Sequence, residues 1–208
     1  MSESSPEPMG SVQPVADVGR RRLLTAATGV VGAIGVGAAA WPFLSSLQPS
    51  DRARIIGAPV EVFIGSLEPG QMTRVQWRGQ TIGIMRRTQA MIDNLAGNNA
   101  RLRDPESNVA QQPGYAQNLH RSIRPEVLVL NIHCTHLGCV PQVLPEVGAQ
   151  PFDANWMGGF FCPCHRSTFD LAGRVYSGVP AVLNLLVPPY SFIDDDTLLI
   201  GVDPEGAV

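Results

Sequence analysis

CTHLGC at Cys134–Cys139 and CPCH at Cys162–His165 are the stretches that decide how this 208-residue chain folds, and 22 residues separate them. Each stretch contains one Cys and His pair and one further Cys, and together they hold all four cysteines of the sequence. Six such side chains exceed the four nitrogen and sulfur ligands that close a tetrahedral metal site. They suit a two-iron, two-sulfide cluster in which two thiolates bind one iron and two imidazoles bind the other.

Simpler interpretations account for these residues less completely. A zinc site could use a subset of the ligands, but neither stretch has the Cys-x-x-Cys spacing of a zinc knuckle. Two structural disulfides would leave two histidines at matching offsets without a role. His133 adjoins Cys134 and is expected to be a strand side chain rather than a ligand, while His120 is expected to be solvated in a polar loop.

The two stretches resemble the cluster-binding loops of the Rieske iron–sulfur subunits of bacterial ubiquinol–cytochrome c reductases, the cytochrome bc complexes. Leu102-Arg103-Asp104-Pro105 and the proline-rich segment 180–189 also match that family. The resemblance implies one 2Fe–2S cluster, with Cys134 and Cys162 on one iron and His136 and His165 on the other. It also implies a disulfide between Cys139 and Cys164, which requires an oxidising compartment.

Roles around the cluster follow from the same resemblance. His165 is implied to be the catalytic residue that hydrogen-bonds quinol, and Leu137 to be the tip residue that contacts cytochrome b and quinol. Ser167 matches a serine whose hydroxyl donates to a bridging sulfide. Pro180 belongs to a loop that shields the cluster from a third side.

Three positions depart from the family pattern. Phe169 stands where many members have a tyrosine that donates to a ligand sulfur, so we expect a lower cluster potential. Arg166 stands where glycine usually follows the histidine; if that glycine serves a backbone turn, the arginine costs about 1 kcal/mol. Its charge would favour the reduced cluster, although Arg166 could instead be a solvated surface residue of little effect. Val182 replaces a second proline of the shielding loop.

The N-terminal part predicts a membrane anchor. Residues 1–19 form a polar tail, and Arg20, Arg21 and Arg22 precede Leu23–Leu47, which are 25 residues without a charge. At about 1.5 Å per residue this run crosses a hydrocarbon core of about 30 Å, so we expect a transmembrane anchor at 20–47. A cleaved signal peptide has a shorter apolar region, and the glycines of this run would weaken a buried soluble helix.

The arginines also predict orientation. Basic residues stay cytoplasmic, so the tail should be cytoplasmic and the rest of the chain periplasmic. Arg20-Arg21-Arg22-Leu23-Leu24 resembles a twin-arginine export signal. Residues 48–58 are expected to be a hinge or tether between the anchor and the head.

Short apolar runs after the tether predict an all-β head domain at 59–208, with its cluster-binding part at about 133–181. Expected strands lie at 60–66, 72–77, 81–85, 126–132, 159–161, 182–187, 190–193 and 198–202, with a tight turn at Arg78-Gly79. Residues 88–96 predict a short helix, and residues 98–121 a polar surface loop. The expected fold is a Rieske-type antiparallel sandwich with a cluster-binding subdomain, plus one N-terminal transmembrane helix.

The net charge of −3 and the lack of a basic stripe argue against nucleic-acid binding. The resemblance implies an electron-transfer subunit of the cytochrome bc complex, single-pass in the cell inner membrane. It would take an electron, coupled to proton release, from ubiquinol at the cytochrome b site, pass it to a membrane-bound c-type cytochrome and so contribute to the proton gradient. The implied partners are these two cytochromes, ubiquinol and the lipid bilayer, in a dimeric multisubunit complex.

Two other functions are compatible with Rieske loops. One is the small subunit of a periplasmic molybdenum oxidase of the arsenite oxidase type, which relays electrons without touching quinol. The other is a soluble Rieske ferredoxin or oxygenase component, but those proteins lack the additional cysteine pair.

Overall fold

The computed structural model describes residues 17–50 and 57–206, and the chain forms two units, residues 1–50 and 51–208, which are described separately. Most of the expected tail, residues 1–16, and part of the expected tether, residues 51–56, therefore lie outside the described residues.

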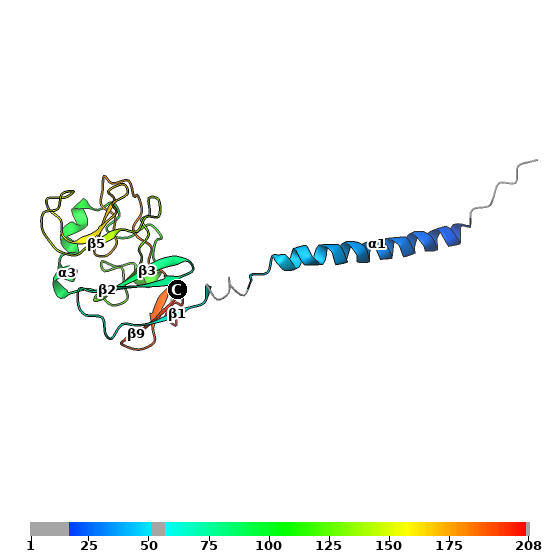
Figure 1. The fold of residues 1–208 in the computed structure, drawn as a ribbon, viewed down its shortest axis with the longest axis horizontal. Helices are drawn as coiled ribbons and strands as arrows, with labels where there is room; N and C mark the ends of the chain where they lie inside the picture. The colour runs from blue at the N-terminus through cyan, green and yellow to red at the C-terminus, as the bar shows by residue number, and fades with distance from the viewer. Residues whose placement is uncertain (1–16, 51–56, 207–208) are drawn as a thin grey trace, which may run out of the picture. The chain divides into compact units, whose positions relative to one another are not determined.

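A single long helix, α1 (Val18–Ser46), makes up the described part of the first unit (Figure 1). It begins two residues before the expected anchor because the Asp17 carboxylate caps it, accepting hydrogen bonds from the Gly19 N–H at 3.0 Å and the Arg20 N–H at 3.2 Å. None of its residues is buried. By length and composition α1 is a candidate membrane span among the described residues, as expected.

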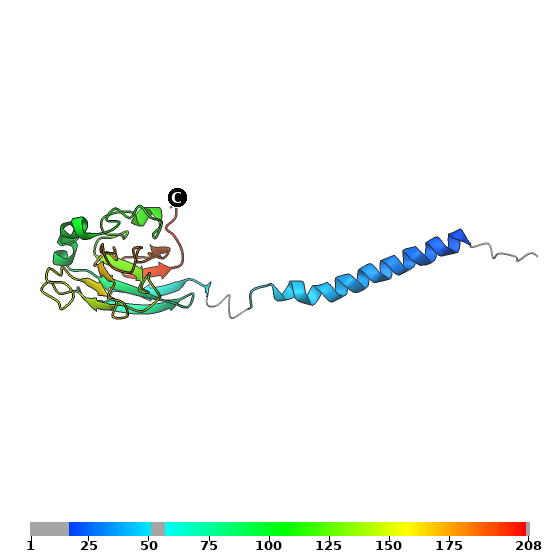
Figure 2. The same ribbon diagram turned by 90° about the horizontal axis from the view of Figure 1, so that it is seen from above.

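The described residues of the second unit form three antiparallel sheets of three strands each. The first has the order β1 (Val60–Phe63), β9 (Thr197–Ile200), β8 (Tyr190–Phe192), and Figures 1 and 2 show the C-terminal strand β9 beside β1. The second has the order β2 (Met72–Trp77), β3 (Gln80–Arg86), β4 (Val127–Asn131). The third has the order β5 (Gln142–Leu144), β6 (Gly159–Phe161), β7 (Thr168–Asp170).

The hairpin between β2 and β3 confirms the expected turn. Trp77 pairs with Gln80, so the loop contains only Arg78 and Gly79. Both have positive φ, 51° and 72°, which is the conformation of a type I′ turn. This turn fixes the register of the two strands.

The core lies on the sheet that leads to the first cysteine–histidine stretch. β4 is buried from Val127 to Leu130, and Ile84 and Met85 of β3 pack in the same core. Burying one such side chain contributes about 1.5–3 kcal/mol. The first stretch therefore follows a strand that is buried in the core.

One expected strand, 182–187, is wrong. Its backbone groups bond to three separate segments: the Asn131 N–H donates to the Leu186 carbonyl, the Leu185 N–H to that of Gly173 and the Val187 N–H to that of Gln111, each at 2.8 Å. Because no single partner strand runs beside it, no ladder forms. β5 and β7, of three residues each, were not expected.

The expected surface loop 98–121 is also wrong in part. The expected helix 88–96 is shorter, α3 (Gln89–Asp93), and two 3₁₀ turns follow, η1 (Ala96–Arg101) and η2 (Gly114–Ala116). Five residues of the supposed loop are buried: Asn98, Leu102, Ser107, Ala116 and Arg121. His120 is half-buried rather than solvated, and burial lowers its pKa.

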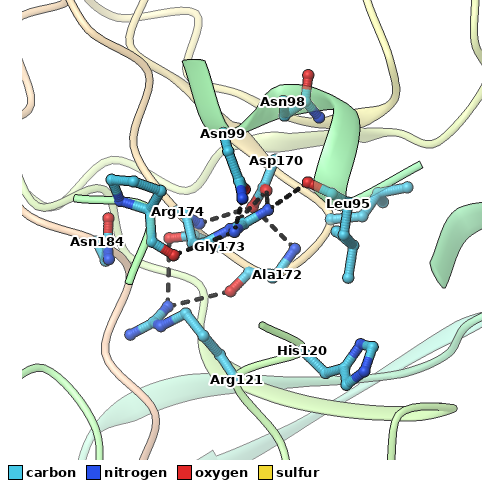
Figure 3. A network of polar contacts seen from close by, with 12 residues as sticks. Leu95, Asn98, Asn99, His120, Arg121, Asp170, Ala172, Gly173, Arg174 and Asn184 are labelled. Atoms are coloured by element: carbon cyan, nitrogen blue, oxygen red, sulfur yellow. Dashed lines mark hydrogen bonds and ion pairs between the residues drawn. The ribbon is translucent and has the colours of Figure 1, made fainter. Parts of the chain in front are cut away.

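A fully buried ion pair explains part of this burial (Figure 3). Asp170 accepts from the N–H groups of Ala172 and Arg174 with one carboxylate oxygen and from the Arg174 guanidinium, at 2.7 and 2.8 Å, with the other. The same guanidinium donates to Asn99 Oδ1 and to the carbonyls of Leu95 and Pro105. The pair therefore joins the turn after β7 to residues 95–105.

A second buried arginine completes this network. Arg121 donates to the carbonyls of Ala172, Gly173 and Leu185. Burial lowers the pKa of Arg121 to about 10, so it still carries its charge at neutral pH. The carbonyl oxygens take the place of water around that charge.

Candidate metal centre

The two cysteine–histidine stretches form backbone turns of the same kind. In the first, which follows β4, the Cys134 N–H donates to the Cys139 carbonyl and the Gly138 N–H to the Cys134 carbonyl, both at 2.8 Å. In the second, between β6 and β7, the Cys162 N–H donates to the Ser167 carbonyl at 2.8 Å and the Arg166 N–H to the Cys162 carbonyl at 2.9 Å. Each cluster loop, Cys134–Cys139 or Cys162–Ser167, is thus a six-residue turn closed by the same two hydrogen bonds.

The fifth residue of each cluster loop has a left-handed backbone. It is Gly138 in the first, with a φ of 79°, and Arg166 in the second, with a φ of 63°. Glycine adopts this conformation freely, whereas a side chain makes it costly. Arg166 therefore occupies a turn position suited to glycine, and its exposed side chain makes no ion pair or hydrogen bond with any described residue.

A disulfide between Cys139 and Cys164 joins the two cluster loops, as expected, with 6.7 Å between the Cα atoms. The Sγ atom of Cys162 also lies within 4.8 Å of both disulfide sulfurs. Because the other two sulfurs are bonded to each other, only Cys162 of this trio can offer a thiolate.

The two remaining cysteines, Cys134 and Cys162, are free and buried. The Cys134 thiol lies within hydrogen-bonding reach of Cys162 and of the Ser167 hydroxyl, and burial raises its pKa. The rings of His136 and His165 meet edge to face, with centroids 4.7 Å apart. The structure thus pairs the two thiols with each other and the two imidazoles with each other, all four in the two cluster loops.

The donor set fits a 2Fe–2S cluster. Two free thiols and two imidazoles are the Rieske combination. His136 Nδ1 is buried and has no hydrogen-bond partner among the described residues, which is costly unless another group binds it. His133 instead has its Nδ1 2.7 Å from Asn131 Oδ1, and it lies two residues beyond the end of β4 rather than in the strand as expected.

The other expected site residues lie in the cluster loops or near them in the sequence. Leu137 is 70% exposed, and His165 and Pro180 are also exposed. Ser167 and Phe169 are fully buried, and Phe169 pairs with Phe160 of β6. The site therefore has an exposed part at Leu137 and His165 and a buried part at Ser167 and Phe169.

Known families match both units of the chain. Residues 60–189 match the Rieske [2Fe-2S] domain, and residues 13–50 match the Ubiquitinol-cytochrome C reductase Fe-S subunit TAT signal. The ubiquinol-cytochrome c reductase iron-sulfur subunit of Allochromatium vinosum is 52% identical over 184 residues, 88% of this chain and 89% of the relative. The chain belongs to the Rieske iron–sulfur subunits of ubiquinol–cytochrome c reductase.

Two further Rieske subunits with the same name are similar over most of their length. That of Blastochloris viridis is 42% identical over 188 residues, 89% of this chain and 94% of the relative. That of Rhodospirillum rubrum is 40% identical over 192 residues, 90% of this chain and 94% of the relative. The expected Rieske fold, 2Fe–2S cofactor and twin-arginine signal are confirmed, and the signal and α1 together fit a membrane-anchored Rieske subunit with an exported head.

Proposed function

We propose that this Rieske subunit binds its cluster through Cys134 and Cys162 on one iron and His136 and His165 on the other. The observation that carries the proposal is that two loops joined by a disulfide contain two free buried thiols and two imidazole rings in edge-to-face contact. The buried, unpaired Nδ1 of His136 supports the same assignment.

The function we infer is electron transfer from ubiquinol, at the quinol-oxidation site of cytochrome b, to a membrane-bound c-type cytochrome. When bound, the cluster supplies one-electron redox chemistry at a potential raised by its imidazole ligands. His165 is exposed, so its ring can accept a hydrogen bond from quinol and hold the proton that quinol releases. The exposed Leu137 in the facing loop offers an apolar contact for cytochrome b and quinol.

The anchor supports a single-pass subunit of the cell inner membrane. Arg20, Arg21 and Arg22 precede the charge-free part of α1, which favours a cytoplasmic N-terminus and a periplasmic head. We assign residues 48–58 as the tether and residues 59–208 as the head. In a dimeric complex with both cytochromes, proton release on the periplasmic side contributes to the proton gradient.

An EPR spectrum of intact membranes, with and without an inhibitor that occupies the quinol-oxidation site, tests this function. We expect a Rieske signal that the inhibitor changes, from a protein that copurifies with b- and c-type haem. A signal unaffected by the inhibitor would contradict quinol contact. Copurification with a molybdenum enzyme and without haem b would support the arsenite oxidase type, which the shared name of the relatives disfavours.

A further inference from the structure

The proline loop, residues 178–183, is hydrogen-bonded to both cluster loops. The Ala181 N–H donates to Ser167 Oγ at 3.0 Å, and Thr135 Oγ1 donates to the Leu183 carbonyl at 2.7 Å. Ala181 and Ser167 are fully buried, so water does not compete for the first of these bonds. The loop therefore contacts the cluster loops through specific hydrogen bonds as well as by shielding them.

Asn184 fixes the end of the proline loop. Its side-chain oxygen accepts from the Val175 N–H at 2.8 Å, and its amide nitrogen donates to the Asp104 carbonyl at 3.0 Å and to Ser107 Oγ at 3.3 Å. The side chain is 1% exposed, and both of its amide hydrogens have acceptors. Figure 3 shows Asn184 near the buried Asp170–Arg174 pair.

The bond from Ala181 decides what the Ser167 hydroxyl can do. A hydroxyl has one proton to donate and lone pairs with which to accept. Because the Ala181 N–H occupies the oxygen, the proton remains free to point towards Cys134, whose sulfur lies within reach. A hydrogen bond to a cluster sulfur stabilises the electron-rich reduced state and raises the potential.

We propose that Asn184 is a positioning residue for the cluster: by fixing the proline loop it keeps the Ala181 N–H on the Ser167 oxygen and so directs the Ser167 proton towards the cluster. The proposal rests on the ligand set proposed above. It predicts that a substitution at Asn184, whose side chain is hydrogen-bonded to none of the four proposed ligands, changes the midpoint potential. This effect should depend on Ser167.

The test uses full-length protein in membranes and a redox titration followed by EPR. Asn184→Leu removes the three hydrogen bonds at similar volume, and we expect it to lower the midpoint potential and to speed amide hydrogen exchange of residues 178–183. Ser167→Ala should lower the potential at least as far. In the double variant, adding Asn184→Leu to Ser167→Ala should lower the potential no further, because the effects of substitutions that act through the same hydrogen bonds are not additive.

Leu198→Ala provides the matched control. Leu198 is fully buried in β9, so its truncation also destabilises the head, but it lies in a different sheet from the cluster loops. We expect it to leave the potential unchanged. An equal shift in this control would mean that general loosening, rather than positioning, sets the potential.

A cluster-loaded Asn184→Leu protein with the wild-type potential would overturn the proposal, and so would an undiminished shift in the Ser167→Ala background. If Asn184→Leu fails to load its cluster, the isosteric Asn184→Asp is titrated instead; it keeps the acceptor for the Val175 N–H and loses both donors. We expect a smaller shift in the same direction, and a wild-type potential would again overturn the proposal. Absence of a Rieske signal in the wild type would instead contradict the ligand set.

Discussion

Replacing Arg166 by glycine should stabilise the head, although it deletes a large side chain beside the cluster. Arg166 has a φ of 63°, and its side chain is exposed without a partner among the described residues. A left-handed backbone costs a residue with a side chain about 1–2 kcal/mol. Glycine removes this cost but loses about 0.5–1 kcal/mol through the greater freedom of the unfolded chain. The expected net gain in the free energy of unfolding is therefore about 0.5–1 kcal/mol.

Gly138, the equivalent position in the first cluster loop, allows the reverse kind of substitution. A Cβ atom at Gly138 would meet nothing within 4 Å, so Gly138→Ala tests the left-handed backbone alone, at a φ of 79°. We expect it to destabilise the protein by about 0.5–1 kcal/mol. The two variants should thus move stability in opposite directions.

Thermal unfolding of the purified full-length protein, followed by near-ultraviolet circular dichroism at one scan rate, measures both changes. For a head of this size the expected shifts in Tm are about 1–4 °C, upwards for Arg166→Gly and downwards for Gly138→Ala. A fall in Tm for Arg166→Gly would refute the reasoning, because it would mean that the guanidinium makes a stabilising contact. The midpoint potential of Arg166→Gly should fall at low ionic strength, since the positive charge beside the cluster favours the reduced state.

Three other outcomes follow from the packing around the site. Phe169→Tyr should raise the midpoint potential by adding a donor near the ligand sulfurs; a titration that shows no rise or a fall counts against this. Replacing both Cys139 and Cys164 by alanine removes the link across 25 residues and should cost about 3 kcal/mol, measured by denaturant unfolding under oxidising conditions; wild-type stability would contradict it. Arg174→Met leaves the buried carboxylate of Asp170 without its partner and should lower the free energy of unfolding by about 3–5 kcal/mol. Arg124→Met, at an ion pair whose acid is 93% exposed, should lower it by less than about 1 kcal/mol. Equal losses would mean that burial does not increase the cost of breaking the pair.

The sequence was informative where local chemistry decides the structure. The Arg78-Gly79 turn, the strands β2 and β6 and the two cysteine–histidine loops each depend on residues adjacent in the chain, and all were predicted. The disulfide pairing came from the family resemblance, because four cysteines alone allow other pairings.

The sequence did not predict features whose hydrogen-bond partners lie far away in the chain. Residues 182–187 are apolar enough for a strand, but their hydrogen-bond partners lie in three segments that no local pattern identifies. Arg121 was expected in a surface loop and the burial of Arg174 was not predicted, because the carbonyls that make their burial possible are 51–79 positions away in the sequence. The left-handed turn shared by Gly138 and Arg166 was visible only in part, through the glycine expected at the second position.

The three neighbouring sulfurs have a consequence for maturation. A thiolate attacks a disulfide sulfur and releases the other cysteine, and Cys162 lies within 4.8 Å of both sulfurs of the Cys139–Cys164 bond. A free Cys162 can therefore exchange into that bond and move the covalent link to the wrong cysteine. A Cys162 sulfur that is bound to iron is not available to attack the disulfide. With the proposed ligand set, insertion of the cluster before the disulfide forms prevents this exchange. The order of maturation, first the cluster and then the disulfide, therefore preserves the Cys139–Cys164 pairing.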